Sequence, residues 1–299
     1  MFFQIFCPVP LIRSSRSRLL NILICVYSFV LLCYPVCIFL KMFFFDRAFQ
    51  GLDITSTVIM CLITLMCLTH FCIIVQTIST RYKHQLTIDL LHDTDTLFRE
   101  CFQVRHIHLS TIFTIQILVL VAILIILYGY FIFFILINDS YFPIFVSIVV
   151  IRMRCLQMVY YVALVHERIS KLNEQLQILS IHFDDSVRTK YSIQLVKTIY
   201  YEKINTLKCI YAQTCRVSKL INACFGWSFL IITTEFFIEI VAIGYIAFLF
   251  WYLNFIGGSA AHELIGITPA AITFIFVCFA CNKCSEKVSM YFGKFKINY

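Results

Sequence analysis

Several stretches of this chain consist almost entirely of apolar residues and are longer than the helices that line a soluble core. The densest of them runs from Ile115 to Leu127. A helix needs about 20 apolar residues to cross the hydrocarbon layer of a bilayer, which is about 30 Å thick. The runs show no alternation of polar and apolar residues, which argues against a transmembrane β-barrel. The chain is therefore predicted to be an all-α integral membrane protein.

The composition excludes the other broad classes. Hydrophobic residues make up 61% of the chain and charged residues 13%, whereas a soluble domain has about 45–50% and about 25%. A chain of this size cannot hide so much apolar surface in water, and a disordered chain needs the opposite composition. The net charge of +8 reflects the cytoplasmic bias of basic residues in membrane proteins. We therefore expect a lipid bilayer and no nucleic acid as its surroundings.

Six transmembrane helices are predicted. Two features decide how the apolar runs divide into spans. Asn138–Tyr141 forms a turn between two spans, and Pro143 suits the first turn of the next helix. The fifth apolar run is too short for two crossings and is predicted to be one long helix. The predicted spans cover residues 19–42, 52–76, 108–137, 142–165, 225–255 and 267–284.

The basic residues orient these spans. Nearly all Lys and Arg outside the spans fall on alternate connecting pieces, and Lys41 and Arg47 alone lie on the opposite side. Because cytoplasmic loops are enriched in Lys and Arg, both termini are predicted to be cytoplasmic in a multi-pass protein of the cell membrane. The predicted organisation is a cytoplasmic N-terminus over 1–18, a transmembrane domain over 19–284 with cytoplasmic helical loops at 77–107 and 166–224, and a tail over 285–299.

Both long cytoplasmic loops have the apolar spacing of amphipathic helices. In the second loop, apolar residues recur every three or four positions, as at Leu172, Leu176 and Leu179, and again at Ile204 and Leu207. The spacing predicts that the fourth span continues as a helix, turns near Asp184–Asp185–Ser186 and returns as a helix that Asp185 or Ser186 caps. We expect these helices to pack into a layer, because an apolar stripe needs a partner.

Four charged residues lie inside the predicted fourth and fifth spans. Glu235 and Glu239 are one helical turn apart on one face, while Arg152 and Arg154 lie within the fourth span. Such residues are expensive in a bilayer and have pairing or functional roles. They form either an interhelical salt bridge or part of a hydrated cavity or gate. Because positions two apart point to different sides of a helix, the two arginines cannot easily share one acid.

Aromatic residues gather in the predicted outer halves of spans 3 and 5. They form either the wall of a pocket for a small ligand or an interfacial belt and core packing. The five residues are Tyr128, Tyr130, Tyr245, Trp251 and Tyr252.

No pattern indicates catalysis or a metal site. The chain has no Gly-rich phosphate loop, nucleophile elbow or His-Glu-x-x-His motif, so we expect no enzyme and no cofactor. Cys278, Cys281 and Cys284 lie on one helical stripe without a nearby fourth ligand, which favours packing over metal, with palmitoylation of Cys284 as an alternative. The polar run His92–Asp95 is predicted to face solvent.

Two stretches resemble a known family. Residues 163–176 resemble the helix below the fourth span of insect gustatory receptors, and residues 219–226 resemble the start of their fifth span. The matching positions are Arg168, Leu172, Asn173, Asn222, Phe225 and Gly226. The resemblance places the chain among the seven-transmembrane insect chemoreceptors.

The resemblance implies a ligand-gated cation channel that senses small-molecule tastants, assembled as a homo- or hetero-tetramer with the seventh helices lining the pore. The sequence reaches Tyr299 just after the sixth predicted span, without the signature of the family's seventh span. A truncated, non-conducting or auxiliary subunit is therefore an alternative, as is an odorant receptor. A six-span transporter is a remote alternative, because the two halves show no internal repeat.

Overall fold

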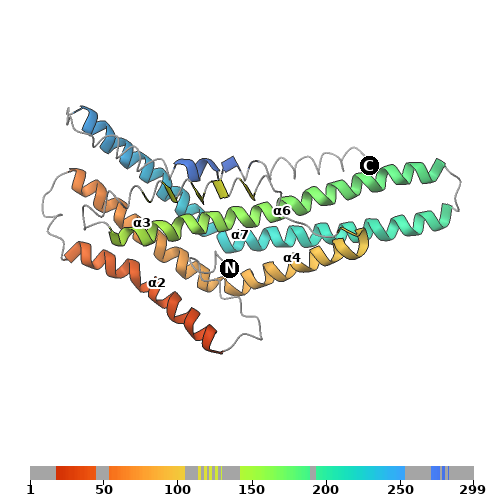
Figure 1. The fold of residues 1–299 in the computed structure, drawn as a ribbon, viewed down its shortest axis with the longest axis horizontal. Coiled ribbons are helices and arrows are strands. Elements are labelled where there is room, and N and C mark those ends of the chain that lie inside the picture. The colour runs from red at the N-terminus through yellow and green to blue at the C-terminus, as the bar shows by residue number, and fades with distance from the viewer. Residues whose placement is uncertain are drawn as a thin grey trace. The chain divides into compact units, whose positions relative to one another are not determined.

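The computed structural model describes the backbone of residues 18–44, 54–104, 142–188 and 193–252, together with scattered residues between 114 and 129 and between 271 and 282. Every secondary-structure element in this described part is a helix (Figure 1). The long helices are α2 (Arg18–Phe44), α3 (Ile54–Ser79), α4 (Arg81–Phe102), α6 (Phe142–Arg188) and α7 (Ile193–Tyr252).

The helix ranges agree with four of the predicted spans. α2 covers the predicted span 19–42, and α3 covers nearly all of 52–76. α6 begins with Pro143 in its first turn, as predicted, and α7 confirms one long helix instead of two spans up to its end at Tyr252. The spans predicted at 108–137 and 267–284 lie mostly outside the described residues, although the residues described there are helical.

Three described helices are long and apolar enough to cross a membrane. They are Met60–Ser79, Val146–Ile181 and Tyr200–Ala242, and a shorter apolar helix covers Cys25–Lys41. At about 1.5 Å per residue, the 47 residues of α6 and the 60 residues of α7 are each much longer than the hydrocarbon layer. Both helices therefore extend beyond the part that a bilayer covers.

The predicted turn near Asp184–Asp185–Ser186 is wrong, and so is the capping role of Asp185 and Ser186. Helix α6 continues through these residues to Arg188, and α7 begins at Ile193. The segment contains neither Gly nor Pro, so nothing in it removes a backbone donor or favours a left-handed residue. Backbone hydrogen bonding therefore carries the helix through the predicted turn to Arg188, two residues beyond Ser186.

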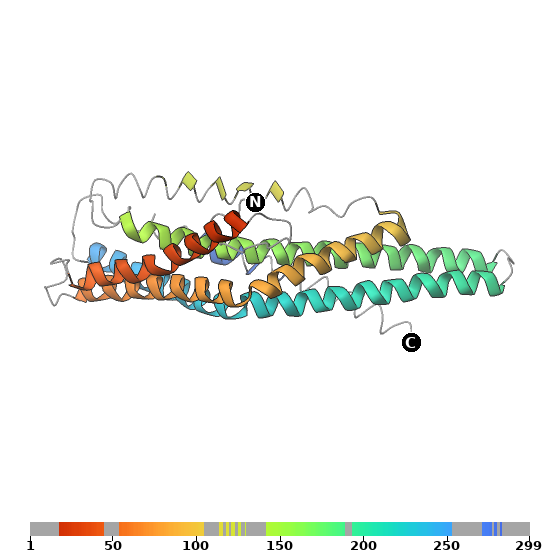
Figure 2. The same ribbon diagram turned by 90° about the horizontal axis from the view of Figure 1, so that it is seen from below.

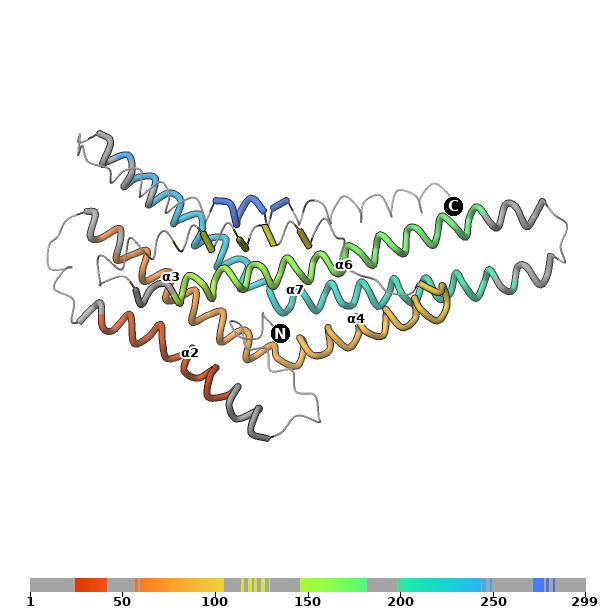
Figure 3. The backbone as a smooth tube through the Cα atoms, in the orientation of Figure 1, coloured from red at the N-terminus to blue at the C-terminus, as the bar shows by residue number. Residues whose placement is uncertain are grey.

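The chain divides into two compact units. Unit 1 consists of Met1–Tyr82, Ile115–Met158 and Cys224–Cys278, and it contains α2, α3, the start of α6 and the end of α7. Its α2 packs against α3 (Figure 3). An apolar cluster there joins Ile38 of α2 and Ile148 of α6 to three residues of α3, which are Ile63, Met66 and Cys67. A second cluster surrounds Met153 and Leu156 of α6 and includes Ile272 and Phe276.

Unit 2 consists of Lys83–Thr114, Val159–Ala223 and Phe279–Tyr299. Within it, the later part of α6 and the early part of α7 run side by side in opposite directions (Figure 2). The core joins the three long helices described in this unit, because Phe98 of α4 packs with residues of α6 and α7. The other members are Leu172, Leu179, Leu207 and Ile210. The predicted packing of amphipathic segments is thus found.

Two local features of unit 2 concern the end of α4 and the buried face of α7. Gln103 has φ of 53° and its amide donates to the Arg99 carbonyl at 3.1 Å, so it ends α4 in the left-handed conformation that usually falls to Gly or Asn. The predicted packing position Ile204 is 41% exposed. The buried face of α7 includes Leu207, Ile210 and Val217. Ile204 lies roughly 100° around the helix axis from the middle of this face, which explains its exposure.

Candidate functional site

A buried ion pair joins α6 to α7 inside unit 1. Arg152 Nη2 lies 2.6 Å from Glu239 Oε2, and both side chains are less than a tenth exposed. The guanidinium of Arg152 also lies 3.9 Å from the ring centroid of Phe236, which adds a cation–π attraction. A short hydrogen bond between two ionised groups is about twice as strong as a neutral one. The pair therefore neutralises two charges that neither helix could bury alone.

The second arginine of α6 has different partners. Arg154 donates through Nη2 to the Cys224 carbonyl at 2.7 Å and through Nη1 to Gln157 Oε1 at 2.9 Å. Its guanidinium lies 4.0 Å from the ring centroid of Phe225, and the residue is 1% exposed. Arg152 and Arg154 thus contact different parts of α7. The sequence argument that they would not share one acid agrees with this geometry.

Glu235 lies one helical turn before Glu239 and is 2% exposed. Its Oε2 atom has no hydrogen-bond partner among the described residues. Arg152 attracts the carboxyl group of Glu235 and Glu239 repels it. The structure therefore gathers Glu235, Glu239 and Arg152, the charge cluster, in one buried place. Two acids share a single arginine there.

Two polar contacts fasten α3 to the same helices. His70 Nδ1 lies 3.0 Å from the Ser147 hydroxyl of α6, and both residues are fully buried. Gln76 Oε1 accepts a hydrogen bond from the Ser228 amide of α7 at 2.7 Å and a second, short one from the Ser228 hydroxyl. Sequence reasoning missed these contacts. The signal that could have found them is a His and a Gln inside an apolar run.

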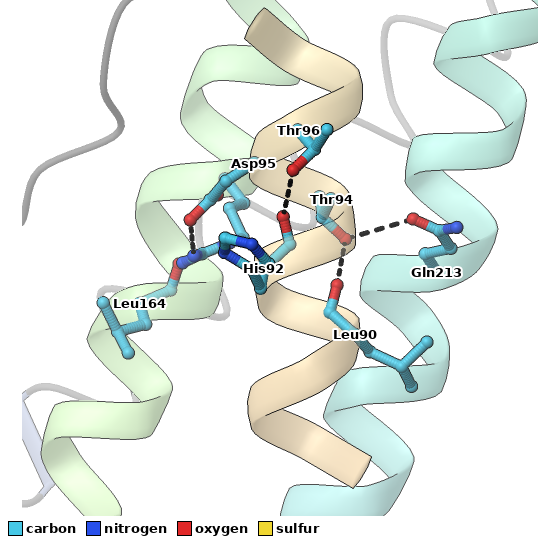
Figure 4. A network of polar contacts seen from close by, with 8 residues as sticks. Leu90, His92, Thr94, Asp95, Thr96, Leu164 and Gln213 are labelled. Carbon is cyan, nitrogen blue, oxygen red and sulfur yellow. Dashed lines mark hydrogen bonds and ion pairs between the residues drawn. The ribbon is translucent and has the colours of Figure 1, made fainter. Parts of the chain in front are cut away.

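Unit 2 contains a separate polar network in which α4 lies between α6 and α7 (Figure 4). Arg168 of α6 donates to Asp95 Oδ2 at 2.7 Å and to the Leu164 carbonyl at 2.8 Å. Thr94 of α4 donates to Gln213 of α7 at 3.2 Å. The prediction that the polar run His92–Asp95 faces solvent is therefore wrong for Thr94 and Asp95, because these positions face the neighbouring helices.

Burial dominates the electrostatics of Asp95. It raises the pKa of the Asp95 carboxyl above its ordinary value, and the nearby Arg168 guanidinium offsets only part of that rise. Taking two charges out of water costs more than their attraction returns unless the geometry is very good. The Arg168–Asp95 pair is thus better suited to fixing how α4 lies against α6 than to adding stability.

The family-like positions fall into two groups. Leu172 is a member of the unit 2 core, Arg168 holds Asp95, and Phe225 lies under Arg154. In contrast, Asn222 is exposed, and Asn173 and Gly226 are partly buried. Three of the six positions thus make contacts that the structure explains by packing or charge.

Of the predicted aromatic wall, the structure describes the side chain of Tyr245 alone. Tyr245 on α7 is 39% exposed. Trp251 and Tyr252 belong to α7, but their side chains lie outside the described residues, as do Tyr128 and Tyr130 entirely. The ligand pocket remains a prediction.

The cysteine stripe is described only at Cys278, which is exposed and forms no disulfide. Cys281 and Cys284 lie outside the described residues. The described part of the chain contains no group of three or more His, Cys, Asp or Glu residues that could hold a metal ion.

A family model described as 7tm chemosensory receptor matches residues 2–297 of the chain. This range includes nearly all of both units and every residue of the charge cluster. No curated protein and no solved structure matches the chain.

Proposed function

Because this chain belongs to the 7tm chemosensory receptor family, we propose that it is a gustatory receptor subunit. In this proposal it lies in the cell membrane with both termini in the cytoplasm and forms a cation channel that small-molecule tastants open. The observation that carries the proposal is the match of the family model over residues 2–297. The aromatic residues Tyr245, Trp251 and Tyr252, with Tyr128 and Tyr130, are the proposed lining of the tastant pocket.

The residues that favour a gustatory over an odorant receptor are the two family-like stretches. Arg168 and Leu172 belong to the first stretch and make the contacts that tie α6 to α4 and to the unit 2 core. Phe225 belongs to the second and covers the Arg154 guanidinium. These contacts give the resemblance a physical basis, because a change at Arg168 or Phe225 would remove a contact of a charged group and a change at Leu172 would open the unit 2 core.

The charge cluster supports a gated protein. Ionisable side chains buried in membrane helices are costly, and they are retained where they pair helices or line a path for ions. The Arg152–Glu239 pair holds α6 against α7 within unit 1. A tastant can open the channel only if it binds the open state more tightly than the closed one. We propose that this pair adds to the free-energy difference between the two states.

The proposed assembly is a tetramer of identical or related subunits in the bilayer. A panel of ligands tests the receptor class. Cells that express the chain, alone and with related subunits, are given water-soluble tastants and then volatile odorants while intracellular Ca²⁺ is imaged. We expect responses to tastants and none in cells without the chain. Responses to odorants alone would replace the gustatory assignment with the odorant one.

A further inference from the structure

We propose that Glu235 is an intramembrane proton-binding site, which holds its proton as a neutral carboxylic acid at neutral pH while Glu239 stays ionised. The inference does not depend on which ligand opens the receptor. It concerns a buried group that the proposed function leaves unused.

The charge count of the cluster carries the argument. Arg152 supplies one positive charge, and its Nη2 atom lies 2.6 Å from Glu239. If both acids were ionised, the cluster would have one excess negative charge in a place where Glu235 is 2% exposed. An ion buried without a partner takes up or releases a proton instead of staying charged. The least costly state is therefore one ion pair and one neutral acid.

The two acids are not equivalent, and geometry decides which one holds the proton. Glu239 receives the Arg152 hydrogen bond, whereas Glu235 Oε2 has no hydrogen-bond partner among the described residues. An accepted charge-assisted hydrogen bond favours the ionised form, and desolvation without one favours the neutral form. The proton therefore belongs on Glu235.

The charged and titratable groups of the packed helices do not change this assignment. On α6, Arg154 directs its two Nη atoms to the Cys224 carbonyl and Gln157. On α3, His70 has its Nδ1 at the Ser147 hydroxyl. The charged groups that act on Glu235 are Arg152, which attracts it, and Glu239, which repels it. Among the described residues, Arg152 is the cation that could offset a negative charge on Glu235, and it already pairs with Glu239.

This site makes the α6–α7 contact sensitive to alkaline pH. Loss of the proton would place a second negative charge one helical turn from Glu239, and the two carboxylates would compete for Arg152. The stability that the neutral acid provides is present at low and neutral pH and is lost as pH rises past the point at which Glu235 ionises.

Infrared spectroscopy of the full chain in lipid nanodiscs tests the proposal, since a protonated carboxyl group has a C=O stretch that a carboxylate lacks. We expect this band in the wild-type chain at neutral pH, its loss at high pH, and its absence in Glu235→Gln. In Glu239→Gln, Arg152 loses its anionic partner, so Glu235 should ionise in its place and the band should be lost there too. The matched control is therefore Glu235→Asp, which keeps an acid at the site and should keep a band at a shifted frequency. A wild-type chain without the band at neutral pH, or a band that persists unchanged in Glu235→Gln, would overturn the proposal.

Stability provides a second readout. Because an amide imitates a neutral acid, we expect Glu235→Gln to melt within a few degrees of wild type at neutral pH, and Glu239→Gln to melt lower. Equal destabilisation by both changes, with recovery by Glu235→Asp, would show that the ionised form of Glu235 is needed. If Glu235→Gln does not fold, Glu235→Asp is used in the infrared measurement, where the frequency of the band should shift.

Discussion

Replacing Glu239 by Gln removes one charge from the buried ion pair and leaves nearly everything else in place. The amide has the shape of the carboxylate and can still accept a hydrogen bond from Arg152 Nη2, which lies 2.6 Å from Glu239 Oε2. The ring of Phe236, at 3.9 Å, still covers the guanidinium. The substitution therefore removes the charge of Glu239 while it keeps packing and shape.

The expected loss follows from the geometry. Unit charges about 4 Å apart attract by about 4 kcal/mol at an effective dielectric constant of about 20. The retained hydrogen bond to a neutral acceptor returns about 1–2 kcal/mol. The free energy of unfolding should therefore fall by about 2–3 kcal/mol, somewhat less than the roughly 3–5 kcal/mol seen when a buried pair loses one partner entirely. For a chain of this size that corresponds to a melting temperature lower by about 5–10 °C.

The assay is thermal unfolding of the purified full chain in one detergent, with the double variant Arg152→Met and Glu239→Leu as the matched comparison. Replacing both members of a buried pair by apolar residues is often neutral or stabilising, so the double variant should recover most of the loss. A Glu239→Gln variant as stable as wild type would refute the reasoning. A double variant less stable than the sum of its single changes would refute it too.

Three further outcomes concern unit 2, each measured by thermal unfolding. Arg168→Lys should cost about 1–2 kcal/mol, because an ammonium cannot reproduce the fork that reaches both Asp95 and the Leu164 carbonyl; full stability would contradict this. Phe98→Ala should lower the free energy of unfolding by about 3–5 kcal/mol, as expected for a fully buried ring. The exposed control Ile204→Ala should change it by no more than about 0.5 kcal/mol. Equal losses in the two variants would contradict this prediction. Because burial raises the pKa of Asp95, its ionised form costs stability above that pKa and the cost fades as pH falls through it. The free energy of unfolding of wild type should therefore rise relative to that of Asp95→Asn as the pH falls. If the two proteins lose or gain stability in parallel across this pH range, the prediction is wrong.

Much of the helical framework was predictable from the sequence. Apolar runs and the turn signal before Pro143 located α2, α3 and the start of α6 within a few residues. The amphipathic spacing around Leu172 and Leu207 predicted the packing found in the unit 2 core. These features depend on period and length, which are local properties of a sequence.

The missed features depend on neighbours that are distant in the sequence. Thr94 and Asp95 look like surface residues on α4 alone. Thr94 is buried and Asp95 is partly covered because α6 and α7 pack against α4. The contacts of His70 with Ser147 and of Gln76 with Ser228 likewise join residues far apart in the chain. Helical period gives the face on which a residue lies, and it does not say which helix packs against that face.

The charge cluster falls between these cases. Sequence reasoning placed Glu235 and Glu239 on one face and separated Arg152 from Arg154, because helical geometry is local. It left open which glutamate forms an ion pair with which arginine. The pairing of Arg152 with Glu239 is set by the register between α6 and α7, which no local pattern contains.

The most direct test of the central claim is to record currents from excised membrane patches that contain the full chain, in solutions without GTP. The account predicts that a tastant found active in the imaging panel opens cation-selective channels within the patch, and that patches from cells without the chain stay silent. Excision removes soluble messengers, so the current must come from a channel in the patch. A tastant response that is present in intact cells and absent from every excised patch would contradict the ligand-gated channel and indicate a receptor that signals through other proteins.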